Sequence, residues 1–65
     1  MKNTLKALRK AAGLSQQDLA DQLGVSRQSI ISIERERYDP SLELALKISL
    51  VLDEPVAEIF LLEEG

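Results

Sequence analysis

The sequence predicts a single all-α domain of five short helices, spanning residues 1–65. Apolar residues recur at three- and four-residue spacings in five segments, as they do on the buried face of an amphipathic helix. Residues that favour helix starts precede most of these segments, and no alternation of strands with helices is visible. A chain of this length is also too short for a second domain.

The first two helices have clear ends. Ser15 is a preferred N-cap, and Asp18 three residues later forms a modest capping box with it. Gly13 and Gly24 are placed to terminate the two helices, because glycine adopts a left-handed backbone without strain. The expected helices cover about residues 4–12 and 15–23, with apolar stripes of Leu5, Leu8 and Ala12 and of Leu19, Ala20 and Leu23.

The remaining three helices follow the same pattern. Ser26 and Ser41 are N-caps of the third and fourth helices, and residues 38–40 form the turn between them. Pro55 suits the first position of a short fifth helix, where its missing N–H is no loss. The fourth helix is apolar over much of its circumference, so we expect it to be central. The positions expected to point inward are Ile30 and Ile33 in the third helix, Leu42, Leu44, Ala45, Ile48, Val51 and Leu52 in the fourth, and Val56, Ile59 and Phe60 in the fifth.

The composition argues against several classes of function. The chain has no Cys and no His, so it lacks disulfides, the usual zinc ligands and the usual general base at neutral pH. The carboxylates lie among Lys and Arg without an apolar pocket around any pair, which disfavours an enzyme and a cofactor site. The longest apolar run, residues 59–62, is far shorter than the roughly 20 residues of a membrane span. We therefore expect a soluble cytoplasmic protein without a cofactor.

The charges are unevenly distributed along the chain. Residues 1–37 carry seven basic and four acidic side chains, whereas residues 38–65 carry one basic and seven acidic side chains. Such a molecule can present a basic face to phosphates despite its net charge of −3. An ordinary solvated surface explains the distribution equally well, so charge alone does not assign a nucleic-acid partner.

The most informative stretch runs from about residue 16 to residue 35. Two short helices are joined there by three or four residues around Gly24 and Val25. Such a short connection makes the helices cross steeply, which is the helix-turn-helix arrangement. The small side chain of Ala20 allows the second helix to cross close to the first.

The outward face of the second of these helices has the chemistry of a major-groove reader. With the two isoleucines inward, a rotation of about 100° per residue places Gln28, Ser32 and Arg35 outward. Arg27 and Ile31 lie beside them. A glutamine amide pairs with the N6/N7 edge of adenine, arginine bonds guanine or a phosphate, and an apolar side chain fits the methyl group of thymine. Gln28 can also be an ordinary solvated side chain and Ile31 a tolerated one, but clustering with arginines favours contacts to DNA.

The same residues resemble a known family. The resemblance rests on AGLSQQDLADQLGVSRQSI at residues 12–30, on Ile33-Glu34, and on RYDPSLELALKI at residues 37–48. These stretches are similar to the Cro/cI-type (XRE) repressors of phages and bacteria, and to a subgroup of very short bacterial members. The resemblance covers almost the whole chain. It implies a lambda-repressor-like fold, a homodimer, and binding to palindromic operators in double-stranded DNA.

The resemblance also implies roles for individual residues. Arg9 is implied to pair with Glu34, which ties the first helix to the third and is structural rather than functional. Gln16 can be a solvated helix start and Ser26 a cap alone, but helix N-termini attract anions and favour phosphate contacts. The implied base contacts are Arg27, Gln28, Ile31 and Ser32, and the implied phosphate contacts are Gln16, Ser26, Arg35, Arg37 and Tyr38.

Two positions depart from the family pattern. Glu36 stands where members usually have Gly, at the end of the recognition helix of about residues 26–36. A left-handed backbone there costs a non-glycine residue on the order of 1 kcal/mol, and the charge lies near the expected path of the phosphates. Glu54 is a poor N-cap where relatives tend to have Ser or Thr. Both departures concern phosphate geometry and affinity, not the fold.

The C-terminal residues bear on oligomerisation. A domain of this size buries only about 60% of its unfolded surface, and self-association is a common remedy. Leu61 and Leu62 are either additional core or part of a homodimer interface at about residues 55–63, and we favour the interface. The resemblance further implies a small β-pairing of Lys2–Thr4 with Leu61–Glu63. The expected interface residues are Val56, Ile59, Phe60, Leu61 and Leu62.

The main hypothesis is therefore a dimeric transcriptional regulator, acting as a repressor or an autoregulator. A two-fold dimer would place its recognition helices about 34 Å apart, one turn of DNA. The alternative is an antitoxin-like or adaptor module whose chief ligand is another protein. The acidic half of the chain and Leu61–Leu62 support that alternative. Salt-sensitive affinity for duplex DNA separates the two hypotheses.

Overall fold

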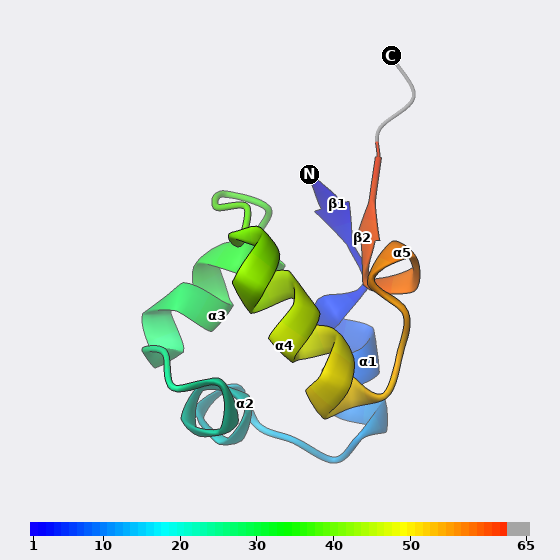
Figure 1. The fold of residues 1–65 in the computed structure, drawn as a ribbon. Helices are drawn as coiled ribbons and strands as arrows, with labels where there is room; N and C mark the ends of the chain where they lie inside the picture. The colour runs from blue at the N-terminus through cyan, green and yellow to red at the C-terminus, as the bar shows by residue number, and fades with distance from the viewer. Residues whose placement is uncertain (63–65) are drawn as a thin grey trace.

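A computed structural model describes residues 1–62 of the chain. Five helices pack into a small bundle, and two short strands lie side by side at one end of it (Figure 1). The elements are β1 (Lys2–Asn3), α1 (Leu5–Ala11), α2 (Gln16–Leu23), α3 (Arg27–Glu34), α4 (Leu42–Leu52), α5 (Val56–Ile59) and β2 (Phe60–Leu61).

The helix starts follow local capping rules. The Asp18 N–H donates a hydrogen bond to the Ser15 hydroxyl at 3.0 Å, and the Ser15 N–H donates one to the Asp18 carboxylate at 2.9 Å. The bond from the Ser15 N–H lowers the pKa of Asp18, because it stabilises the charged carboxylate. Ser26 and Ser41 cap α3 and α4 with their hydroxyls. Pro55 is the N-cap of α5 and not, as expected, its first residue.

The two strands pair within one chain as an antiparallel sheet. The Thr4 N–H donates to the carbonyl of residue 59 at 2.8 Å, and the Thr4 hydroxyl donates to the carbonyl of residue 58 at 2.6 Å. These two bonds hold Thr4, the residue after β1, against the end of α5. The second strand, β2, begins directly after that helix. The expected partner segment, 61–63, therefore started one residue too late, and position 63 lies outside the described residues. The register places Lys2 opposite Leu61 and Asn3 opposite Phe60.

The hydrophobic core draws on all five helices. Leu23 and Leu44 complete it at its margin, with 6% and 9% of their surfaces exposed. Half-buried apolar side chains, among them Leu14, Val25 and Phe60, pack against it from outside. The largest fully buried side chains are Leu5, Leu19, Ile30, Ile33, Ile48 and Ile59.

Other expectations about the helices are wrong as well. Phe60, expected on the inner face of the fifth helix, is instead the first residue of β2 and is half-buried. Ala12 is exposed, and the buried stripe of α1 consists of Leu5 and Arg9. The fourth helix is not central. It packs against α2 and α5 through one face, whereas Leu42, which was expected to point inward, exposes 73% of its surface. An apolar face of α4 is therefore left open to solvent. Within the described residues, no helix combines the length and the apolar character needed to cross a bilayer.

Candidate nucleic-acid interface

The helices α2 and α3 form a helix-turn-helix pair joined by three residues, 24–26. Gly24 ends α2 in the left-handed conformation, with φ of 72°. The Val25 N–H donates to the Ala20 carbonyl at 3.1 Å, which fixes the turn against α2. Ala20 is fully buried, so its small side chain allows the two helices to approach closely. The connection is too short for antiparallel packing, and the helices cross steeply (Figure 1).

One face of α3 is locked into the core, and the opposite face is open. Ile30 and Ile33 are both fully buried. On the open face, the Gln28 amide lies 3.4 Å from the Ser32 hydroxyl one turn later. A hydrogen bond of that length is weak, so a base edge can replace it at little cost. The structure exposes Arg27, Gln28 and Arg35, and leaves Ile31 and Ser32 half-buried.

Gln16 lies where α2 meets α3. It is the first residue of α2, and its Nε2 donates to Glu34 Oε1 at 3.2 Å. Its side chain is therefore held at the helix N-terminus, where backbone N–H groups without helical partners attract anions. The same side chain borders a surface depression of about 270 Å³, which is lined by Lys6, Gln16, Arg27, Ile31, Glu34 and Arg35.

Lys6 belongs to this depression, although the sequence did not single it out. It lies on α1 and adds a third cation to Arg27 and Arg35. Three cations around one depression suit phosphate groups. Lys6 is three residues before Arg9, which puts the two on neighbouring parts of one helix face. Because Arg9 was expected to pair with Glu34 of α3, the same reasoning could have predicted from the sequence that Lys6 lies near α3.

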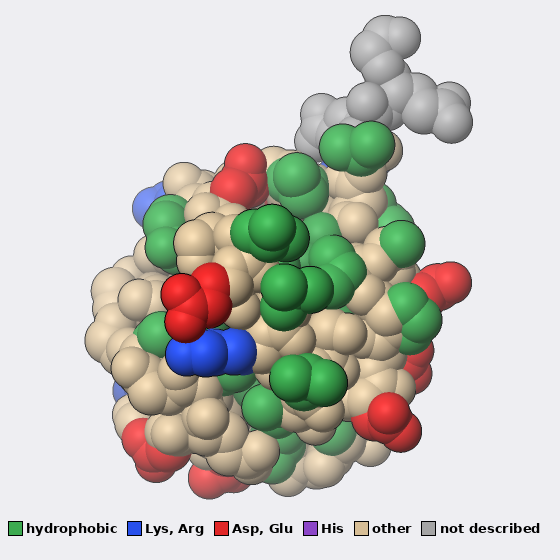
Figure 2. All heavy atoms as spheres, in the orientation of Figure 1, with side chains coloured by type: hydrophobic (Ala, Val, Ile, Leu, Met, Phe, Trp, Pro, Cys, Tyr) green, Lys and Arg blue, Asp and Glu red, His purple; other side chains and the backbone are tan. Residues whose placement is uncertain are grey.

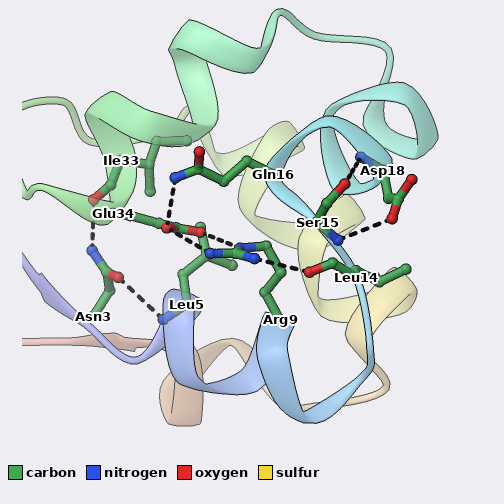
Figure 3. A network of polar contacts seen from close by, with 9 residues as sticks. All are labelled: Asn3, Leu5, Arg9, Leu14, Ser15, Gln16, Asp18, Ile33 and Glu34. Atoms are coloured by element: carbon green, nitrogen blue, oxygen red, sulfur yellow. Dashed lines mark hydrogen bonds and ion pairs between the residues drawn. The ribbon is translucent and has the colours of Figure 1, made fainter.

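Glu34, which lines the depression, belongs to a buried ion pair with Arg9 (Figure 3). Arg9 donates to both oxygens of Glu34, at 2.6 and 3.2 Å, and the two side chains expose only 7% and 4% of their surfaces. The hydrogen bond to Glu34 raises the pKa of Arg9 above its ordinary value. Arg9 also donates to the Leu14 carbonyl at 2.8 Å. Because Gln16 donates to the same carboxylate, the pair fixes α1, α2 and α3 against one another.

The end of α3 adopts the conformation that the family pattern implied. Glu36 has φ of 61°, in the left-handed region that glycine prefers. Its carboxylate accepts a hydrogen bond from the Asn3 N–H at 3.2 Å, so the charge is turned toward β1. Arg37 next to it is exposed. Tyr38, 46% exposed, shares a shallow depression with Ser26, Gln28, Ser29 and Ser32.

The residues expected at a dimer interface differ in exposure. Ile59 is fully buried in the core of its own chain, so its assignment to an interface is wrong. Val56 and Phe60 are half-buried. Leu61 and Leu62 expose 38% and 86% of their surfaces, which leaves both available to a partner.

Comparisons with known proteins agree with this geometry. Residues 5–59 match the model of a helix-turn-helix family. An uncharacterized HTH-type transcriptional regulator of Methanocaldococcus jannaschii is 52% identical over 64 residues, which cover 98% of this chain and 97% of the relative. The restriction-modification controller protein C.AhdI of Aeromonas hydrophila has a TM-score of 0.78 and 39% identity over 86% of this chain and 85% of its own. SinR in complex with DNA has a TM-score of 0.74 and 40% identity over 80% of this chain and 84% of its own.

These matches confirm the expected lambda-repressor-like fold of five helices with a helix-turn-helix, here with a small terminal sheet. The relatives occur in archaea as well as bacteria, so the short bacterial members are one part of a wider group. They are regulators of transcription and not enzymes. The chain belongs to the XRE-type helix-turn-helix family of DNA-binding transcriptional regulators.

Proposed function

We propose that the chain is a homodimeric repressor or autoregulator that reads a palindromic operator with α3. The observation that carries the proposal is the open strip of polar and basic side chains on α3. Ile30 and Ile33, both fully buried, hold that strip outward. SinR, 40% identical to this chain over the shared domain, has been solved in complex with DNA, which supports the same use of the helix here.

Base contacts come from the middle of the strip. Gln28 has the donor and acceptor that match adenine, and within the described residues its side chain makes one hydrogen bond, the weak one to Ser32. Arg27 is exposed and can bond guanine through two parallel hydrogen bonds. Ser32 accepts or donates to any base. Ile31, half-buried, presents the rest of its apolar surface to a thymine methyl group.

Phosphate contacts come from the edges of the strip. Gln16 and Ser26 stand at the starts of α2 and α3, where the first N–H groups have no partner within their helix. Arg35, Arg37 and Tyr38 follow at the other end of α3 and are exposed. Lys6 joins them across the depression between α1 and α3.

The decisive experiment selects bound sequences from a random duplex library and then measures affinity for the selected operator. Gln28→Ala should weaken operator binding by about 1–3 kcal/mol, roughly 5- to 150-fold in Kd, and change affinity for random duplex far less. Gln22→Ala removes the same functional group from an exposed position on α2 and is the matched control. Equal losses on both duplexes would refute Gln28 as a base reader.

Salt dependence tests the phosphate contacts separately. Each phosphate contact releases counterions, so the logarithm of the affinity should fall linearly with the logarithm of the salt concentration. Lys6→Gln should reduce that slope by about 1 without changing which sequences are selected. A slope that stays the same would exclude Lys6 from the phosphate surface.

The proposed homodimer uses the apolar face of α4 together with β2. Leu42, Leu46 and Leu50 expose 73%, 50% and 81% of their surfaces at four-residue spacing. Hydrophobic side chains gather over α4 and continue toward the strands in Figure 2. The ion pair of the N-terminal amine with Asp39, 3.2 Å long, holds the start of β1 beside the loop that leads into α4. The proposed interface also includes the exposed Leu61 and Leu62 and the half-buried Val56 and Phe60.

This face is self-complementary. Under a two-fold axis through the middle of the row, Leu46 meets its own copy, and Leu42 of one copy meets Leu50 of the other. Glu43 and Lys47, 3.4 Å apart, flank the row on one side. In an antiparallel pair that side faces its own copy, so each glutamate lies within reach of a lysine on the other chain. Apolar contact and charge therefore both fit a second copy.

Sedimentation equilibrium tests the dimer. Leu46→Glu brings two like charges together at the axis, a juxtaposition that costs several kcal/mol, so the dimer dissociation constant should rise more than about 100-fold. Ala7→Glu adds the same charge at an exposed position on α1 and should leave it unchanged. A wild-type chain that stays monomeric at micromolar concentration would contradict the dimer and favour a different protein partner for this face.

A reporter experiment tests the direction of regulation. The selected operator is placed over a promoter, and expression is compared with and without the protein. Repression predicts lower expression with the wild-type chain and unchanged expression with Gln28→Ala. Higher expression with the wild-type chain would reverse the proposed role.

A further inference from the structure

One side chain in β1 caps two different helices. Asn3 Oδ1 accepts a hydrogen bond from the Leu5 N–H at 3.1 Å, at the start of α1. Thr4, the N-cap of α1, makes no side-chain cap bond, so Asn3 takes that role. Asn3 Nδ2 donates to the Ile33 carbonyl at 2.8 Å, at the end of α3 (Figure 3). Asn3 therefore joins the first turn of α1 to the last turn of α3.

The Ile33 carbonyl lies where α3 needs external support. The last carbonyls of a helix have no partner within it, and this one also accepts from the Glu36 N–H at 2.9 Å. Glu36 then takes the left-handed conformation, which strains a non-glycine residue. The Asn3 N–H donates to the Glu36 carboxylate at 3.2 Å. Asn3 thus contacts this turn at two points: its side chain bonds the Ile33 carbonyl before the strained position, and its backbone N–H bonds the carboxylate of the strained residue itself.

The other edge of the same strand is bonded to the C-terminal segment. Asn3 lies opposite Phe60 in the sheet, and Thr4 is hydrogen-bonded to the carbonyls of residues 58 and 59. β1 is therefore a short bridge. On one side it holds the strand that leads to Leu61 and the proposed dimer face, and on the other it holds the turn between Arg35 and Arg37.

We propose that Asn3 is a positioning residue for DNA binding: it fixes the end of the recognition helix to the terminal sheet and so sets the direction of Arg35 and Arg37. The proposal rests on the function proposed above. It also assigns Glu36 a role, because its carboxylate is a partner of β1. Asn3 itself touches no DNA in this scheme and acts through the backbone of α3.

Two substitutions of Asn3 distinguish its bond to the start of α1 from its bond to the end of α3. Asn3→Asp keeps the acceptor for the Leu5 N–H and removes the donor to Ile33, whereas Asn3→Ala removes both. Thr4→Val is the matched control, because it removes the neighbouring bond to Glu58 and no contact with α3. Hydrogen exchange of individual amides by NMR reports each site without any ligand, after correction for the global stability of each variant.

The expected pattern is specific to each amide. The amides of Glu36 and Arg37 should exchange roughly 3- to 10-fold faster in both Asn3 variants, the effect of losing one hydrogen bond. The Leu5 amide should exchange faster only in Asn3→Ala. Thr4→Val should leave all three amides unchanged after the correction. Unchanged exchange at Glu36 and Arg37 in the Asn3 variants would overturn the proposal.

Operator affinity completes the test. Both Asn3 variants should bind the selected operator roughly 3- to 10-fold more weakly than Thr4→Val under conditions where all are folded. Faster exchange with unchanged affinity would reduce Asn3 to a structural residue and refute the positioning role. A wild-type chain that binds no duplex would contradict the proposed function itself, whereas the exchange pattern would still show whether Asn3 fixes the end of α3.

Discussion

The buried ion pair between Arg9 and Glu34 makes a strong prediction about stability. Glu34→Leu replaces a side chain that is only 4% exposed with an apolar one of similar size. Arg9 then keeps a single described partner, the Leu14 carbonyl at 2.8 Å, for a charged group that is 7% exposed. An arginine guanidinium keeps its proton in proteins even without an anionic partner, so the charge remains. The variant therefore holds an uncompensated buried charge.

The magnitude follows from the burial of both partners. Removing one member of a buried pair typically costs about 3–5 kcal/mol, a large fraction of the roughly 3–10 kcal/mol of stability expected for a domain of this length. Replacing both members by apolar residues is often neutral or stabilising by about 1–4 kcal/mol. We therefore expect Glu34→Leu to be strongly destabilised and the double variant Arg9→Met/Glu34→Leu to be about as stable as the wild type.

Urea denaturation followed by far-UV circular dichroism measures both variants, at one fixed chain concentration because a dimer makes stability depend on concentration. With a slope of about 1 kcal/mol per molar urea for a small domain, a loss of 3 kcal/mol moves the midpoint by about 3 M. A loss below about 1 kcal/mol for Glu34→Leu would refute the reasoning. So would a double variant as unstable as the single one.

Three further predictions concern local conformation and pH. Asp53 ends α4 with φ of 55°, so Asp53→Gly should stabilise the fold by about 0.5–1 kcal/mol in thermal or urea denaturation, since glycine adopts this conformation without strain. Gly24→Ala should destabilise it by about 1 kcal/mol in the same assay: a Cβ there meets no atom within 4 Å, so the cost is that of the left-handed backbone with φ of 72°. The lowered pKa of Asp18 contributes stability that is present above the ordinary pKa of about 3.9 and is lost as pH falls through the folded value. Denaturation midpoints between pH 5 and pH 2 should therefore fall less steeply for Asp18→Asn than for the wild type, and parallel curves would contradict this assignment.

The sequence by itself determined the features that depend on a few neighbouring residues. Ser15, Ser26 and Ser41 each cap a helix, and Gly24 ends α2. The rotation of Gln28 away from the core followed from the positions of Ile30 and Ile33 on the same helix. Such features were predictable because caps, turns and helical periodicity act within about one turn of the chain.

Only the tertiary structure decided which apolar surfaces are covered and which distant groups meet. Ala12 and Leu42 are apolar and lie at helical spacing, yet both are exposed, because no other element within residues 1–62 covers those sides of α1 and α4. The bonds of Asn3 to Ile33 and Glu36 join positions thirty or more residues apart. Local patterns carry no information about such pairs, since their distance depends on how whole helices cross. Most residues of the candidate DNA surface could therefore be predicted from the sequence. The contacts of β1 with the end of α3 could be found only in the folded structure.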